Sequence, residues 1–217
     1  MKLTMALGAV AAGVTVVVAA LVLSSDGSED PLTPRTDQGR VGAQVQVDAD
    51  VEDGGPIVEV PPHGWFVRGA SGKVFTDGLE RLELSGALPA TLLAIESVGT
   101  GASLELFDAM IAGPERTMGA IQTVPRFPPE AKSLGELEEL EGLTIAPFDQ
   151  TDEWGHVLIL GYRITSDQPA VREGLRVTCE VEGTTYERFV PARLIYCGAS
   201  MRGRECDAYA DDQFPDG

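Results

Sequence analysis

Uncharged, mostly apolar residues run without interruption from Met5 to Leu23, near the start of the 217-residue chain. As a helix rising about 1.5 Å per residue, this run would be roughly 28 Å long, which matches the roughly 30 Å hydrocarbon core of a bilayer. Lys2 precedes the run and Asp26 follows it, which is typical of an N-terminus in the cytoplasm. The pattern predicts a transmembrane anchor over residues 5–23, cytoplasmic residues 1–4 and an extracytoplasmic remainder.

A cleaved secretory signal is the alternative for this run, and the protein would then be secreted. Signal peptides usually have an apolar core of about 7 to 15 residues that ends at a small-residue cleavage site. The run from Met5 to Leu23 is longer and no Ala-x-Ala pattern ends it, although cleavage before Ser25 stays open. These features favour an uncleaved anchor.

The segment that follows, residues 24–44, is rich in Ser, Asp, Gly and Pro and almost lacks large apolar side chains. Such a segment cannot offset its ordering entropy by burying apolar surface. It is predicted to be a disordered stalk.

Short apolar stretches separated by turn residues fill the chain from residue 45 onward. Between Trp65 and Phe127, turn signals recur at close to the spacing of about 8 to 12 residues that is typical of a β-sandwich. In Leu82-Glu83-Leu84 the apolar residues share one face, as expected for antiparallel strands that cover a core on one side. The pattern predicts a mainly β domain over residues 45–206.

Two later segments carry the clearest strand patterns. Val157–Ile164 is nearly continuous in apolar residues, as expected for a central strand covered on both sides. Leu175–Val181 alternates strictly, Glu182-Gly183 supplies turn residues, and Thr184–Val190 follows. This order predicts a β-hairpin.

One segment departs from the strand pattern. Leu134, Leu137 and Leu140 fall on one stripe of a helix, Ser133 is placed as its cap, and Gly142 as its stop. The spacing predicts one short surface helix between Ser133 and Gly142.

In this C-terminal region the chain resembles a known group of proteins. The succession of Val157–Arg163, Arg176–Val181, Gly183–Tyr186 and Pro191–Cys197 is similar to the C-terminal part of small bacterial membrane-anchored proteins of unknown function. The resemblance implies an antiparallel immunoglobulin-like β-sandwich behind an N-terminal transmembrane helix. It implies no activity and no functional residues, because the family has none established.

The charge of the chain narrows the range of partners. The formal net charge is -18 and the isoelectric point lies near 4.3. Phosphate backbones and anionic headgroups are normally held by clusters of Lys and Arg, so nucleic-acid binding is not expected. The membrane is expected as a partner only through the N-terminal helix.

The cysteines suit an exported domain. Cys197 and Cys206 enclose a loop short enough to bring their Cα atoms within about 6 Å, which predicts a disulfide between them. Cys179 shares its strand face with Val177 and Val181 and is expected to be an inert buried thiol, although its pairing with Cys197 or Cys206 stays open. After Cys206, residues 207–217 are acidic and aperiodic, and a disordered tail is predicted.

Motifs for chemistry are missing from the sequence. The two histidines, His63 and His156, lie beside turn residues, and no zinc spacing, phosphate loop or dinucleotide fingerprint is present. An acidic stretch from Asp48 to Glu59 approaches a calcium loop, but Asp53 occupies the sixth position, which requires Gly. We therefore predict no catalytic, cofactor-binding or metal-binding residue, and calcium binding near Asp48 to Glu59 stays an open alternative.

Two aromatic residues beside a strand allow opposite interpretations. Trp65 and Phe66 follow two prolines and could form an exposed recognition patch or belong to the core. The sequence as a whole favours a non-enzymatic binding or assembly module of the cell envelope with an unknown protein partner. A carboxylate-dependent hydrolase or accessory subunit of an envelope enzyme, and a structural spacer, are the alternatives.

Overall fold

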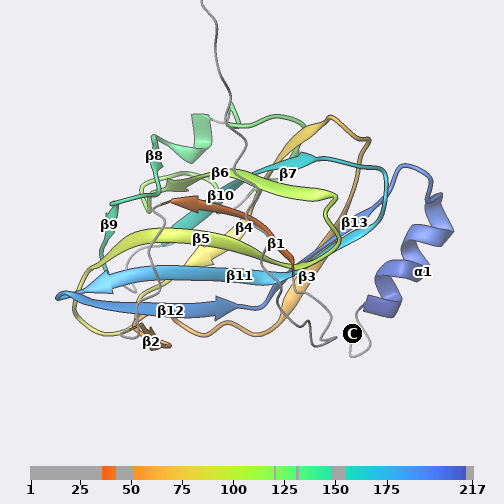
Figure 1. Ribbon diagram of the computed structural model, residues 1–217. Coiled ribbons are helices and arrows are strands. Elements are labelled where there is room, and N and C mark those ends of the chain that lie inside the picture. The colour runs from red at the N-terminus through yellow and green to blue at the C-terminus, as the bar shows by residue number, and fades with distance from the viewer. Residues whose placement is uncertain (1–35, 43–50, 120, 131, 148–154, 214–217) are drawn as a thin grey trace, which may run out of the picture. The chain divides into compact units, whose positions relative to one another are not determined.

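The computed structural model of the chain describes residues 36–42, 51–119, 121–130, 132–147 and 155–213 (Figure 1). The predicted anchor over residues 5–23 lies outside these ranges. Within them, no helix is both long enough and apolar enough to cross a bilayer.

Two β-sheets account for most of the described chain, which confirms the mainly β prediction (Figure 1). The large sheet contains β1 (Thr36–Gly42), β2 (Glu52–Asp53), β3 (His63–Arg68), β5 (Ala90–Thr100), β9 (Thr144–Ile145), β11 (Ala170–Val181), β12 (Thr184–Val190) and β13 (Ala192–Cys197). The small sheet has the order β7 (Ile121–Val124), β4 (Val74–Leu82), β10 (His156–Ile164), β6 (Leu104–Ala112) and β8 (Leu137–Glu139). A short 3-10 helix, η1 (Lys132–Leu134), and the helix α1 (Gly203–Gln213) complete the described elements.

Strand β11 organises the large sheet. Along one side it pairs with β5, and along the other it pairs with β12 through its C-terminal half and with β13 through its N-terminal half. Most strand pairs are antiparallel, as predicted, but β2 joins β12 and β3 joins β13 in parallel. The prediction of a wholly antiparallel arrangement is therefore wrong at these two edges, where β2 runs in the same direction as β12 and β3 in the same direction as β13.

The core lies between the facing sides of the two sheets. Leu92 and Leu175 of the large sheet share one buried cluster with Leu158 and Leu160 of the small sheet. Val157 and Ile159 point to the other face of the small sheet, where residues around η1 and Phe127 cover them. Strand β10 is thus a central strand covered on both sides, as its continuous apolar run predicted.

The predicted hairpin is confirmed by the pairing of β11 with β12. Val181 lies opposite Thr184, and the pairing continues to Leu175 opposite Val190. Between the strands, Glu182 has φ 49° and Gly183 has φ 81°. Two successive residues with positive φ are the conformation that a two-residue hairpin loop requires.

The helix predicted between Ser133 and Gly142 is wrong. Only η1 is helical there, Gly135 adopts φ 70°, and Leu137–Glu139 forms β8. Strand β8 pairs with the last residues of β6, and Leu134 and Leu140 are buried on either side of it. The apolar spacing fits a helix equally well, but the edge of β6 supplies backbone partners that favour a strand.

Ordered structure also extends past both predicted ends of the domain. Strand β1 occupies part of the predicted stalk, residues 24–44, because its backbone pairs with β5. Gly39, at φ 117°, fits against the backbone of Leu106, where a side chain would clash. Helix α1 occupies residues 207–213 of the predicted disordered tail, since Cys206 and Ala210 pack on β13. The rest of both segments lies outside the described residues.

Candidate functional site at the edge of β3

Strand β3 forms an edge of the large sheet. The N–H of His63 donates to the carbonyl of Pro191 over 3.2 Å, which starts the parallel ladder with β13. In such a ladder alternate residues bond to the partner strand, so His63, Trp65 and Val67 face β13. The backbone groups of Gly64, Phe66 and Arg68 point to the other side, where no strand of the described chain pairs with β3.

The side chains of β3 alternate between the core and the surface. Trp65 packs against the core cluster and Val67 is buried. Phe66 is 45% exposed, and the guanidinium of Arg68 lies 5.3 Å from the centroid of its ring. Trp65 therefore belongs to the core, and Phe66 lies at the surface. An unpaired edge that carries an exposed aromatic side chain is a template for another strand.

A groove of about 590 Å³ lies beside this edge. Its walls come from β3, the following loop, the start of β4 and the ends of β7 and β10. Most lining side chains are apolar, including Val67, Phe75, Val124 and Ile164, and the cationic ones are Arg68 and Lys73. The groove therefore offers apolar surface together with positive charge on a strongly acidic chain.

A buried ionic cluster lies beneath the edge. The side chain of Arg172, from β11, is 0% exposed and donates to Asp77 Oδ2 over 2.8 Å and to Glu80 Oε1 over 3.4 Å. It also donates to the Tyr162 hydroxyl over 3.1 Å and stands 5.4 Å from the centroid of the Trp65 ring. These contacts join both sheets to the inward face of β3.

His63 connects this cluster to the surface. Its Nε2 atom lies 3.1 Å from Glu80 Oε2, and its side chain is 41% exposed. Burial raises the pKa of Asp77 and that of Glu80 above the usual carboxyl range, although Arg172 opposes both shifts. Neither carboxylate lines the groove. The cluster holds the start of β3 against β4.

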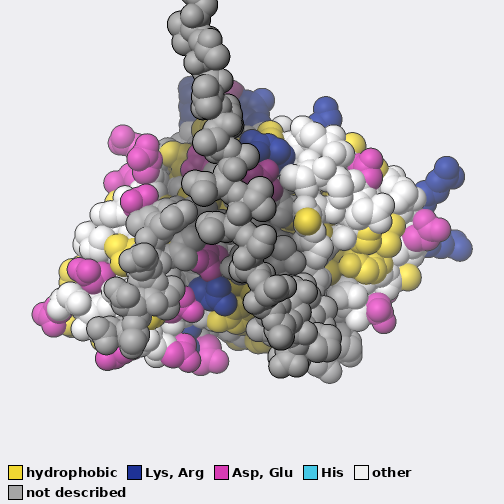
Figure 2. All heavy atoms as spheres, viewed as in Figure 1, with side chains coloured by type: hydrophobic (Ala, Val, Ile, Leu, Met, Phe, Trp, Pro, Cys, Tyr) yellow, Lys and Arg dark blue, Asp and Glu magenta, His cyan; other side chains and the backbone are white. Residues whose placement is uncertain are grey.

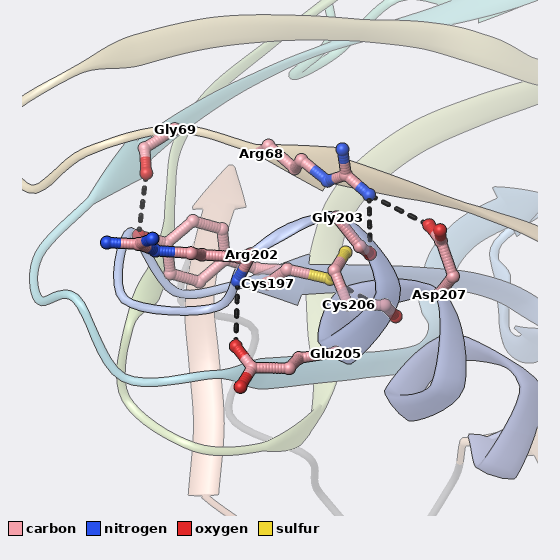
Figure 3. Close-up of a disulfide and its surroundings, with 9 residues drawn as sticks. Arg68, Gly69, Cys197, Arg202, Gly203, Glu205, Cys206 and Asp207 are labelled. Carbon is pink, nitrogen blue, oxygen red and sulfur yellow. Dashed lines mark hydrogen bonds and ion pairs between the residues drawn. A yellow bond between two sulfur atoms is a disulfide. The ribbon is translucent and has the colours of Figure 1, made fainter.

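A disulfide and α1 hold the opposite end of β3. Cys197 and Cys206 form the disulfide predicted from the sequence, with their sulfur atoms 1.96 Å apart. Cys179 is a free thiol, and burial raises its pKa to about 11. Arg68 reaches from β3 to the first turns of α1, where it donates to Asp207 Oδ1 over 2.8 Å and to the Gly203 carbonyl over 3.2 Å (Figure 3). Helix α1 thereby fixes the orientation of the Arg68 side chain.

The remaining candidates do not converge on a site. His156 begins β10 and lies opposite Leu82 of β4. In the possible calcium segment, Asp48 lies outside the described residues, while Glu52 and Asp53 form β2 and pair with β12. Among the residues that the structure describes, no group of His, Cys, Asp and Glu is placed to hold a metal ion.

The buried cluster was missed in the sequence analysis. Arg172 and Asp77 are 95 positions apart, so no local spacing connects them. A usable signal was the presence of charged residues inside apolar strand patterns, since an inward-facing charge requires a partner.

The face of the molecule shown in Figure 2 is mixed in character. On the face shown in Figure 2, Asp and Glu side chains are scattered widely, and hydrophobic surface gathers on the right, toward α1. Comparison of the chain with protein-family models, with curated proteins and with solved structures finds no match. Function is therefore inferred from the edge of β3 and the groove beside it.

Proposed function

We propose that this chain is a non-enzymatic binding or assembly module of the cell envelope, and that it holds an extended segment of another polypeptide at the open edge of β3. One observation carries the proposal: the outward backbone groups of Gly64, Phe66 and Arg68 face no strand of the described chain, and an apolar groove lies at the Arg68 end of β3. Strand addition uses such an arrangement, because the edge supplies main-chain hydrogen bonds and adjacent pockets receive alternate side chains.

The proposed location rests on the sequence and on the disulfide. The apolar run from Met5 to Leu23 suits a single-pass anchor with its N-terminus in the cytoplasm. A structural disulfide such as Cys197–Cys206 persists in oxidising compartments outside the cytoplasm. We propose an immunoglobulin-like arrangement for the two sheets, which the resemblance of the C-terminal region supports.

The alternatives receive less support from the geometry. A carboxylate-dependent hydrolase needs acidic side chains that reach a substrate, whereas Asp77 and Glu80 are buried against Arg172. A spacer has no use for an unpaired strand edge with an exposed aromatic residue, since such an edge promotes aggregation.

Site-specific photocrosslinking in the native envelope tests the proposal. A benzoylphenylalanine at position 66 of the full chain should form a reproducible adduct with a polypeptide that mass spectrometry identifies. The control places the same group at position 189, because Phe66 and Phe189 are each 45% exposed. The proposal is wrong if position 66 gives no adduct beyond that of position 189.

A further inference from the structure

We infer that the polypeptide bound at the edge of β3 is a second copy of this chain, whose own β3 pairs antiparallel with the first around Phe66. This inference rests on the proposed function and names the partner at the same edge. It follows from the order of side chains and backbone groups between Gly64 and Arg68.

The backbone groups of β3 are self-complementary. If Phe66 of one copy lies opposite Phe66 of the other, each N–H donates to the opposite carbonyl, as in the hydrogen-bonded pairs of antiparallel strands. In this register Gly64 lies opposite Arg68, and these residues also present their N–H and C=O groups outward. Each outward group between positions 64 and 68 then has a partner, and a two-fold axis passes through the centre of the pair.

The side chains fit the same register. The two Phe66 rings face each other across the axis, and the long Arg68 side chain lies opposite Gly64, which has no side chain to obstruct it. Arg68 stays near Phe66 and Asp207, because both contacts lie on the outer side of the sheet. The two copies therefore meet without rearranging α1.

Charge favours this edge over the rest of the surface. Each copy carries a formal charge of -18, so two copies repel each other over most approaches. Residues 63–68, His-Gly-Trp-Phe-Val-Arg, contain no acidic side chain, and the adjoining groove contributes the exposed Lys73. The edge of β3 is thus a place where two acidic chains can approach without bringing acidic side chains of β3 together.

The expected contact is closed and weak. A two-fold pair uses both edges, so it forms a dimer and not a growing fibre. The six residues of β3 make a much smaller interface than the roughly 1,600 Å² typical of stable complexes. Dimerisation should therefore depend on a high local concentration, such as tethering to a membrane provides.

Disulfide trapping of the purified full chain in lipid vesicles tests the inference. In the proposed register the two Cα atoms of residue 66 are about 5.5 Å apart, within the range of a disulfide. The Phe66→Cys variant should therefore form a covalent dimer under mild oxidation. Native thiols should not interfere, because Cys179 is buried and Cys197 is bonded to Cys206.

Two matched variants serve as controls. In the proposed register the Gly64→Cys residues of the two copies are separated by about four residues of strand, or about 13 Å, which is too far for a disulfide. Phe189→Cys has the native exposure of Phe66 but lies on β12. Dimer yield should be several-fold lower for both controls than for Phe66→Cys.

Each outcome decides the inference. Equal yields from all three variants indicate random collision and overturn it, as does the absence of a Phe66→Cys dimer. As a second measurement, benzoylphenylalanine at position 66 of the purified chain should give an adduct of twice the chain mass. If position 66 instead captures a different identified protein in the envelope, the inference of a second copy is wrong while the proposed function stands. If position 66 gives no adduct in the envelope or with the purified chain, both the inference and the proposed function are wrong.

Discussion

The charge of Arg172 is the residue-scale feature on which β3 depends. Burial alone would lower the pKa of Arg172, but Tyr162, Asp77 and Glu80 raise it, so the guanidinium stays charged. Removing a charged group from water costs several kcal/mol, and only close partners offset that cost. Arg172 and its two carboxylates therefore depend on one another, and loss of Arg172 leaves both carboxylates without their cation.

Replacing Arg172 should destabilise the protein strongly. Arg172→Met leaves Asp77 and Glu80 buried without their cation, and the free energy of unfolding should fall by about 3 to 5 kcal/mol in urea titrations. Arg126→Met is the control, since its side chain pairs with Glu130 at the surface, and it should cost less than about 1 kcal/mol. Similar losses from the two variants would contradict the importance of the buried cluster.

The buried carboxyls should also make stability depend on pH. Because burial raises the pKa of Asp77, the folded protein keeps this proton to a higher pH than the unfolded chain does. The contribution of this proton to the free energy of unfolding is fully present below about pH 4 and is lost as the pH rises through the raised pKa of Asp77. Oδ1 of Asp77 has no hydrogen-bond partner in the described chain, in keeping with a carboxyl that is costly to ionise.

The Asp77→Asn variant measures this effect. Asn cannot ionise, so the free energy of unfolding should fall less between about pH 4 and about pH 8 than it does in the wild type. Glu138→Gln removes an exposed carboxyl and should follow the wild-type curve. If Asp77→Asn also follows that curve, the proton on Asp77 does not contribute.

At the scale of elements, α1 depends on its covalent link to β13. Met201 and Tyr209 add partly buried apolar contacts around Cys206, but the helix has only 11 residues and lies at the end of the described chain. Isolated helices of this length are marginal in water. The disulfide and the Arg68 contacts therefore add to the packing of Cys206 and Ala210 in holding the helix in place.

The double variant Cys197→Ser/Cys206→Ser tests this dependence. The linked residues are 9 positions apart, and on the chain-entropy model the loss of so short a loop costs about 2 to 3 kcal/mol. Amide exchange should accelerate throughout α1 and stay slow in β10. A reducing agent should have the same effect on the wild type and none on the double variant; protection of α1 without the disulfide would contradict this account.

Elements defined by local patterns were predictable from the sequence, and elements defined by distant partners were not. The hairpin of β11 and β12 depends on alternation and on the Glu182-Gly183 turn, and β10 depends on its own apolar run. Leu134, Leu137 and Leu140 fit two structures, and the edge of β6 decides between them. The edge proposed for binding was unpredictable for the same reason, since the pairing of β3 with β13 decides which side of β3 lacks a partner among the described strands.

At the scale of the whole molecule, net charge should control association. Two copies with a formal charge of -18 each repel one another at low ionic strength. Raising NaCl from about 20 mM to about 300 mM shortens the screening length severalfold and should increase the yield of the Phe66→Cys dimer. A yield that falls with salt would contradict this control of association by net charge.

The parallel pairing of β3 with β13 also sets the order in which the protein can fold. His63 lies opposite Ala192, so most of the chain must be synthesised before β3 finds its partner. Contacts between such distant residues form slowly, because a long loop must close first. Until then both sides of β3 are unpaired on the nascent chain, and Pro61 and Pro62 immediately before it limit mispairing, since proline cannot donate to a ladder. Under the proposed function, β3 can hold a partner in its native geometry only after β13 has paired with its other side, so docking would have to follow synthesis of the C-terminal strands.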